Sequence, residues 1–330
     1  MSSEEISLEK LSRDLLALAS DEERLDQLAE LLSSVLPVYL KEPLARKYFE
    51  FWQDKGFHLT PVHYYQPVPD TRDLPDELWD TRSKLPGIDM NPIVQLDLLK
   101  NVFPRYKDEW DQIPNEPSDN PHEFYFGNGA IDGTDALVLY CMVRHFKPNL
   151  VLEVGSGFSS RLTARAALLN GNTRLVCIEP YPDDVLINGF PGLHTLIPIR
   201  AQDAGFGLFQ QLAANDILFI DSSHVVRCGG DVNYLFLEVL PRLNPGVIVH
   251  IHDIFLPNEF PRDLVKDCHF FWTEQYLLQA FLTFNSEFEI LFANAYMANN
   301  HNAEMQATFP NALWWGGGSF WIRRTQNKRA

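Results

Sequence analysis

A buried strand that leads straight into a glycine-rich turn and then a helix restricts this chain to few folds. The segment reads VLEVGSGFSS at residues 151–160. Glycines after a strand let the backbone turn tightly and let a ligand approach closely, and the following helix offers free amide groups at its N-terminus. The segment therefore predicts a nucleotide-type ligand site on a Rossmann-like sheet.

The same alternation of strands and helices continues along the rest of the chain. A helix is expected over 134–146 and another over about 274–284. Buried, continuous strands that alternate with helices are typical of a parallel sheet covered on both faces. We therefore expect an α/β fold over residues 122–330, with a Rossmann-like, doubly wound, mostly parallel seven-stranded sheet. The expected strands are 150–154, 175–179, 193–199, 217–221, 247–252, 289–293 and 319–323.

The first 121 residues follow a different pattern. Leucines at helical spacing predict two helices within residues 6–36, with Ser20 and Glu23 as a capping box for the second, and a third helix is expected over 43–55. The segment 58–121 combines many prolines with aromatic residues, so it predicts ordered loops and short helices. We expect residues 1–121 to be a separate helical and loop-rich region that caps the active site or builds a homo-oligomer.

Charge and cysteine content narrow the class of protein. The chain has 44 acidic and 27 basic residues and a net charge of −17, which disfavours a nucleic-acid partner. The four cysteines, Cys141, Cys177, Cys228 and Cys268, form no CxxC pair, which indicates a reducing compartment. No apolar run approaches the roughly 18 residues of a membrane span, and the first residues do not resemble a signal peptide. We expect a soluble cytoplasmic protein with no membrane partner.

The residues around the glycines distinguish between possible ligands. A dinucleotide-binding fingerprint would need glycine or alanine at position 160, which is serine, and Glu153 stands two places before Gly155. A carboxylate there would repel a pyrophosphate and attract the cationic amino acid end of S-adenosylmethionine. The run from Glu153 to Gly157 resembles the E/D-x-G-x-G motif of class I S-adenosylmethionine-dependent methyltransferases, and the resemblance continues over about residues 133–323.

The resemblance implies roles for several strand-end residues. It places Glu153, Gly155, Ser156 and Gly157 at the cofactor, Glu179 on the ribose hydroxyls, Asp203 against the adenine amino group and Asp221 close to the methyl donor. Four acids at the ends of successive strands support this interpretation, because open α/β sheets bind ligands at that edge. Each acid alone would be read as a helix cap or a solvated loop residue.

A second group of polar residues follows the fourth and fifth strands. Residues 221–224 read DSSH and residues 250–253 read HIHD, so Asp221, His224, His252 and Asp253 are expected to converge. His224 or His252 can serve as the general base for a substrate hydroxyl. Alternatively, Asp221, His252 and Asp253 hold a divalent cation such as Mg²⁺ or Mn²⁺. This second arrangement resembles metal-dependent O-methyltransferases that act on catechols and on sugars of natural products. A purely structural role for these histidines is the third possibility.

The sequence thus predicts an S-adenosylmethionine-dependent methyltransferase. The expected reaction is O-methylation of a hydroxyl on a small molecule, either a sugar or a phenolic natural product. In this interpretation His224, His252 and Asp253 are the catalytic residues. Two alternatives stay open, a NAD-dependent Rossmann oxidoreductase and a noncatalytic S-adenosylmethionine-binding partner protein.

Overall fold

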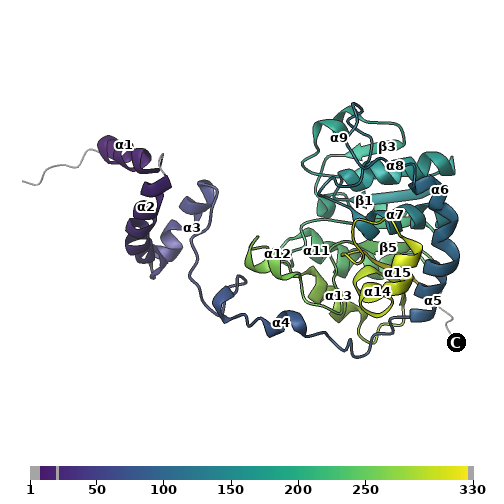
Figure 1. Cartoon of the computed structure of the whole chain (residues 1–330). Coiled ribbons are helices and arrows are strands. Elements are labelled where there is room, and N and C mark those ends of the chain that lie inside the picture. The colour runs from purple at the N-terminus through teal and green to yellow at the C-terminus, as the bar shows by residue number, and fades with distance from the viewer. Residues whose placement is uncertain (1–7, 20–21, 326–330) are drawn as a thin grey trace, which may run out of the picture. The chain divides into compact units, whose positions relative to one another are not determined.

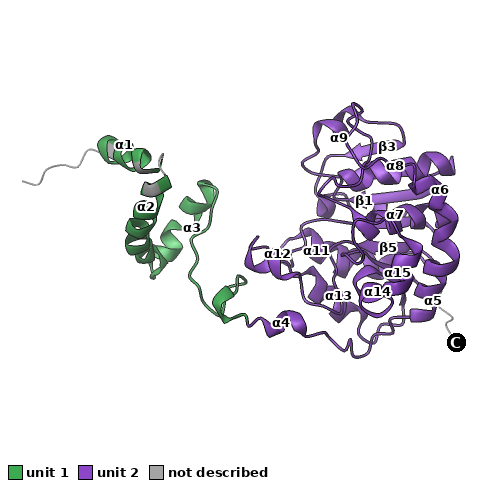
Figure 2. Ribbon diagram, viewed as in Figure 1, with its two compact units in different colours: residues 1–74 green, residues 75–330 purple. Residues whose placement is uncertain are grey.

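The computed structural model describes residues 8–19 and 22–325 and divides the chain into two compact units, residues 1–74 and 75–330 (Figure 2). The sequence placed the boundary after residue 121 instead. Residues 75–121 belong to the second unit because their apolar side chains enter its core, where Leu99 and Phe103 are fully buried and Trp110 nearly so. A role of the N-terminal residues as a cap or an oligomerisation element stays a prediction.

Unit 1 consists of helices, as the leucine pattern predicts. It contains α1 (Leu8–Ala19), α2 (Glu22–Val35), a 3₁₀ turn (Leu36–Leu40) and α3 (Leu44–Asp54). The capping box expected at Ser20 lies outside the described residues. Aromatic rings gather between the 3₁₀ turn and α3, where the Tyr39 ring lies 5.1 Å from Tyr48 and 5.3 Å from Trp52. None of the described side chains in this unit is fully buried.

Unit 2 is built on one seven-stranded sheet with the strand order β3-β2-β1-β4-β5-β7-β6. Strands β1 to β5 pair in parallel, and β7 runs antiparallel to both β5 and β6. The predicted doubly wound α/β fold is confirmed, and each strand lies within two residues of its expected position. The strands are β1 (Leu150–Val154), β2 (Arg174–Ile178), β3 (Leu193–Ile197), β4 (Ile217–Ile220), β5 (Ile248–Ile251), β6 (Phe288–Ala293) and β7 (Phe320–Arg324).

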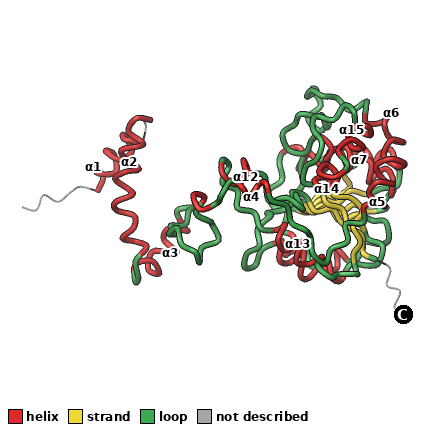
Figure 3. The backbone as a smooth tube through the Cα atoms, turned by 60° about the horizontal axis from the view of Figure 1, so that its bottom comes forward, coloured by secondary structure: helices red, strands yellow, loops and turns green. Residues whose placement is uncertain are grey.

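Helices cover both faces of the sheet (Figures 1 and 3). Alternate residues of the central strands enter different cores, so that Val151 packs on one face with α7, α8 and α15, and Leu152 packs on the other with α11 and α13. Burial of both faces explains why the strands are almost continuously apolar. The helices of this unit are α4 (Glu77–Asp80), α5 (Pro92–Asp97), α6 (Lys107–Trp110), α7 (Gly133–Phe146), α8 (Phe158–Asn170), α9 (Asp184–Asn188), α10 (Phe206–Phe209), α11 (Asp231–Tyr234), α12 (Arg262–Lys266), α13 (Glu274–Leu282), α14 (Asn294–Asn300) and α15 (Asn302–Thr308).

Helices α14 and α15 were not predicted from the sequence. Their asparagines at 294, 299, 300 and 302 obscure the helical pattern, and their only fully buried apolar side chains are Met297 and Met305. In the part of the chain that the structure describes, no helix is both long and apolar enough to cross a membrane.

Candidate active site

The glycine-rich turn brings three strand ends together. Gly155 follows β1 with a φ of +80°, and its amide donates to the carbonyl of Ile178 at the end of β2. A β-carbon at this position would lie 1.7 Å from the carbonyl oxygen of Asp221, just after β4. The close approach and the positive φ both require glycine. The three strand ends surround a cavity of about 280 Å³.

Glu179 is held in place at the wall of this cavity. One carboxylate oxygen, Oε2, accepts a hydrogen bond of 3.1 Å from the amide of Ser156. The other, Oε1, accepts one of 2.8 Å from the amide of Tyr181. The carboxylate is thus oriented before any ligand arrives. Gly155 and Asp221 also line the cavity, whereas Ser156 and Gly157 do not. Ser156 therefore contributes through its backbone amide.

The structure does not bring Asp203 to the cavity. Its carboxylate forms a two-point ion pair with Arg200, with nitrogen–oxygen distances of 2.7 and 3.1 Å, and about half of the side chain is exposed. The neighbouring Gln202 lines the cavity instead, and its Oε1 atom is buried without a hydrogen-bond partner among the described residues. An unpaired buried acceptor is unfavourable, so Gln202 is the better placed of the two to receive a ligand's amino group.

Glu153 is fully buried and does not line the cavity. Its Oε1 accepts hydrogen bonds from the hydroxyls of Ser159 at 2.6 Å and Ser160 at 2.9 Å, both at the start of α8. Burial raises the pKa of Glu153 to about 8, and the two hydroxyl groups only partly offset this effect. In the structure Glu153 ties β1 to α8 beneath the glycine turn. Because Glu153 does not reach the cavity, it does not make the direct contact with a ligand's amino group that the sequence suggested.

Protonation of Glu153 should make stability depend on pH. The folded-state pKa of about 8 lies above the usual value of 4.5, so the stabilisation is fully present below about pH 4 and is lost as pH rises through about 8. We expect Glu153→Gln, which stays neutral, to remove this loss. Compared with the wild type, it should gain about 2 to 4 kcal/mol in unfolding free energy between pH 5 and 8. Denaturant unfolding over a pH series measures this difference. Glu238→Gln, at an exposed site, is the control, and parallel curves for Glu153→Gln and the wild type would refute the prediction.

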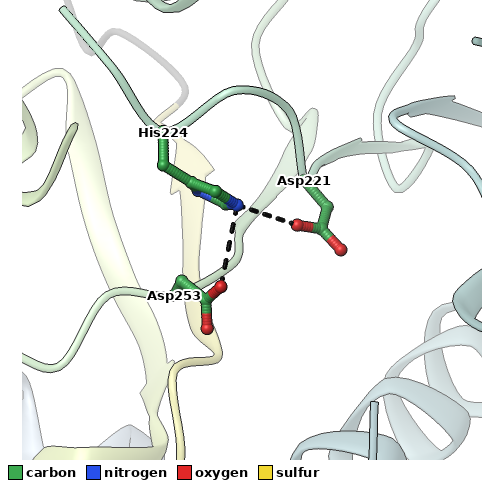
Figure 4. A group of neighbouring side chains, drawn as sticks. All are labelled: Asp221, His224 and Asp253. Carbon is green, nitrogen blue, oxygen red and sulfur yellow. Dashed lines mark ion pairs between the residues drawn. The ribbon is translucent and has the colours of Figure 1, made fainter. Parts of the chain in front are cut away.

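A second cluster lies next to the cavity, where β4 and β5 end. Asp221, His224 and Asp253 point toward one another (Figure 4). The Nε2 atom of His224 lies 3.2 Å from Oδ1 of Asp221 and 3.6 Å from Oδ2 of Asp253. One ligand atom from each of the three side chains falls within 4.8 Å of the others. Asp221 also lines the cavity, so the two sites share this residue.

The backbone reaches this geometry through two unusual residues. His224 has a φ of +58° and Asp253 a φ of +56°, in the left-handed region that non-glycine residues rarely adopt. Such conformations are unfavourable and concentrate at functional sites. Gly318 packs against the second of them, because a β-carbon there would lie 2.6 Å from the Cα of Asp253.

Glu274, the first residue of α13, completes the surroundings of His224. Its Oε2 lies 2.9 Å from the Nδ1 of His224, and the side chain is 1% exposed. Burial by itself lowers the pKa of His224, but the hydrogen bonds with Asp221 and Glu274 outweigh it and raise the pKa to about 10. Sequence reasoning missed Glu274, because an acidic residue in the first turn of a helix ordinarily indicates only a favourable interaction with the helix dipole.

His252 lies beside this cluster rather than within it. Its Nε2 is 3.8 Å from Oδ1 of Asp253, and its Nδ1 is buried with no hydrogen-bond partner in the described residues. His224 therefore takes the place in the three-residue group that the sequence gave to His252. His250 is fully buried on the same side of β5, with its ring stacked 4.5 Å from that of Trp321.

The donor set of this cluster fits a divalent cation. Three carboxyl groups, those of Asp221, Asp253 and Glu274, surround the imidazole of His224, and burial raises the pKa of Glu274. Burial opposes ionisation of Asp221, yet the charges of His252 and His224 hold its pKa below the usual range. Two carboxylate oxygens and one imidazole nitrogen are ligands that Mn²⁺, Zn²⁺ and similar ions accept.

The family comparison agrees with this architecture. Residues 152–254, from β1 to just past β5, match the family described as "Methyltransferase domain". This segment contains the glycine turn, Glu179 and all three residues of the cluster. Together with the strand order, the match defines residues 152–254 as a methyltransferase domain on a Rossmann-like sheet.

A curated relative is an uncharacterized protein from Archaeoglobus fulgidus. It is 32% identical over 175 residues, which cover 50% of this chain and 78% of the archaeal protein. The chain belongs to the same family as this archaeal protein.

Solved structures of similar chains include three methyltransferases. TomG from Streptomyces achromogenes, an O-methyltransferase involved in tomaymycin synthesis and solved with S-adenosylmethionine, is 17% identical, with 70% of this chain and 90% of TomG covered and a TM-score of 0.38. PaMTH1 from Podospora anserina is 14% identical, with 87% and 97% covered and a TM-score of 0.38. An O-methyltransferase from Bacillus cereus is 13% identical, with 72% and 98% covered and a TM-score of 0.36. Likeness at this level does not define an activity.

Proposed function

We propose that the chain transfers the methyl group of S-adenosylmethionine to a hydroxyl oxygen of a small molecule. The observation that carries the proposal is the position of Asp221, which lines the cofactor cavity and also belongs to the cluster with His224 and Asp253. A group that spans both sites places methyl donor and methyl acceptor side by side. Methyl transfer needs this proximity, because the acceptor oxygen attacks in line with the carbon–sulfur bond that breaks.

The cluster supports the removal of the acceptor's proton. As the new carbon–oxygen bond forms, the hydroxyl proton must leave, and the carboxylates of Asp221 and Asp253 are placed to accept it or to orient the group that does. With a pKa raised to about 10, His224 without a bound cation holds a proton at neutral pH, and this charge contributes to the lowered pKa of Asp221. A divalent cation held by Asp221, His224 and Asp253 would supply a Lewis acid that lowers the pKa of the acceptor hydroxyl.

The cofactor side of the proposal rests on the strand ends. Glu179, fixed by two backbone amides, is proposed to accept hydrogen bonds from the two ribose hydroxyls. Gln202 is proposed to accept a hydrogen bond from the adenine amino group. A NAD-dependent oxidoreductase is less favoured, because residue 160 is serine where the dinucleotide-binding fingerprint has glycine or alanine. A noncatalytic S-adenosylmethionine-binding partner protein would not need the cluster.

The acceptor and the compartment are also proposals. A small-molecule acceptor such as a phenol or a sugar is favoured over nucleic acid by the net charge of −17. The four cysteines are all free, and Cys228 and Cys268 are exposed, which favours a reducing, cytoplasmic environment. The helices of unit 1 leave apolar side chains such as Leu16 and Phe49 exposed, so we propose that a homo-oligomer forms through them.

The ribose assignment predicts the behaviour of two variants. Glu179→Ala removes two charge-assisted hydrogen bonds to the cofactor, so binding of S-adenosylhomocysteine should weaken by about 2 to 4 kcal/mol. Asp203→Ala should change the affinity less than about two-fold, because Asp203 does not line the cavity and its half-exposed carboxylate pairs with Arg200. Calorimetric titration of both variants measures the two effects. If both substitutions weakened S-adenosylhomocysteine binding equally, Asp203 would also be a cofactor-binding residue, as the sequence predicted.

The proposed reaction is tested with labelled S-adenosylmethionine and a panel of catechols, phenols and sugars. Transfer of the label to a hydroxyl of any of these acceptors, dependent on Asp221, supports the proposal. Transfer to amines or thiols alone would exclude O-methylation.

A further inference from the structure

Glu274 is a buried carboxylate whose role the proposed reaction does not explain. Its Oε2 contacts the Nδ1 of His224 at 2.9 Å. Its Oε1 is buried and has no hydrogen-bond partner in the described part of the chain. Burying a carboxyl group with one oxygen unpaired is energetically unfavourable. The contact of Glu274 with His224 therefore indicates a specific role for this buried carboxyl group.

The contacts around His224 show that α13 and the residues before it hold the imidazole in one orientation. The carbonyl oxygen of His224 accepts hydrogen bonds from the amides of Thr273 at 2.9 Å and Glu274 at 3.0 Å. The ring of Trp272 lies 4.6 Å from the imidazole. The backbone, the ring and the Nδ1 atom of His224 are therefore all contacted by one short segment, residues 272–274, at the start of α13.

The hydrogen bond to Glu274 also selects the tautomer. An ionised Glu274 can only accept a hydrogen bond, so it requires the Nδ1 of His224 to carry a proton and donate it. In the neutral imidazole the lone pair then lies on Nε2, the atom that faces Asp221 and Asp253 at 3.2 and 3.6 Å. A carboxylate behind the far nitrogen of a ligating histidine orients the ring and makes the near nitrogen a stronger donor.

We propose that Glu274 is a positioning residue that fixes His224 as the nitrogen donor of a cation site completed by Asp221 and Asp253. The inference rests on the proposed function for the presence of a cation beside the acceptor. It goes further in assigning Glu274 and the kind of ion. A site with an imidazole donor favours ions such as Mn²⁺, Co²⁺ or Zn²⁺ over Mg²⁺, which prefers oxygen ligands and keeps its waters.

Cobalt binding to the full chain tests this role without any acceptor. Co²⁺ is titrated into the wild type, Glu274→Gln and His224→Asn, since asparagine tolerates the φ of +58° at residue 224. Binding is followed by calorimetry and by the visible absorption that reports nitrogen ligation. Glu274→Gln should weaken Co²⁺ binding by about 10- to 100-fold and alter the spectrum. The matched control is Glu259→Gln. Glu259 lies in the loop after β5, accepts a hydrogen bond from the hydroxyl of Tyr276 on α13, and lies outside the cluster. The control should bind Co²⁺ as the wild type does.

A double variant separates positioning from a general structural effect. If Glu274 acts through His224, Glu274→Gln combined with His224→Asn should bind Co²⁺ no more weakly than His224→Asn alone. The inference would be overturned if the effects of the two substitutions were fully additive, or if Glu274→Gln bound Co²⁺ as tightly as the wild type does. It would also be overturned if the wild type bound Mg²⁺ more tightly than Co²⁺. Binding of S-adenosylhomocysteine is measured in parallel, and an unchanged affinity shows that the variants fold. If the wild type does not bind S-adenosylhomocysteine at all, the proposed function itself is refuted.

Discussion

The Asp253→Asn variant is expected to lose methyl transfer by at least about 100-fold while binding S-adenosylhomocysteine as tightly as the wild type. Asp253 faces His224 but does not line the cofactor cavity, so we expect its charge to act on the methyl acceptor and not on the cofactor. Asparagine is the suitable replacement because it tolerates the φ of +56° at this position, whereas alanine would strain the turn.

Turnover of Asp253→Asn is measured under saturating S-adenosylmethionine, with cofactor affinity determined separately by calorimetry. Asp263→Asn on α12 serves as the control, because that carboxylate is exposed. Retention of more than half of the wild-type turnover would remove Asp253 from the acceptor site. A parallel loss of cofactor affinity would assign it to the other half of the site.

Gly155→Ala should abolish cofactor binding and lower stability. An added β-carbon would lie 1.7 Å from the carbonyl oxygen of Asp221, in a backbone conformation with a φ of +80° that alanine disfavours. Backbone atoms cannot yield as a flexible side chain would, so the ends of β1 and β4 must move apart. We expect a loss of about 2 to 5 kcal/mol in unfolding free energy, in the range of severe steric substitutions.

Thermal unfolding and titration with S-adenosylhomocysteine measure the two effects of Gly155→Ala. Gly207→Ala is the matched control, because a β-carbon there meets nothing within 4 Å and the residue lies away from the cavity. Wild-type affinity in Gly155→Ala would show that the turn does not shape the cofactor site.

The sheet and the cofactor side could be predicted because they depend on local patterns. Each strand is a short apolar run, and the ends of parallel strands share one edge, so Glu179 and Asp221 could be placed near a ligand before any contact was known. Asp203 shows the limit of this reasoning. A pattern gives the strand end to within a residue or two, and a shift of one residue exchanges Asp203 for Gln202 at the cavity wall.

The surroundings of His224 could not be predicted, because they depend on contacts between distant segments. Glu274 is 50 residues from His224 in sequence, and no local pattern relates them. The place of residues 75–121 was missed for the same reason. Side chains such as Phe103 are buried against residues of the sheet and of α15, far along the chain.

The central claim, that this fold binds S-adenosylmethionine for methyl transfer, is tested most directly by calorimetric titration of the purified chain with S-adenosylhomocysteine and, separately, with NAD. The account predicts one S-adenosylhomocysteine site per chain in the micromolar range, about −7 to −9 kcal/mol, and no measurable binding of NAD. Binding of NAD without binding of S-adenosylhomocysteine would contradict the account and favour an oxidoreductase.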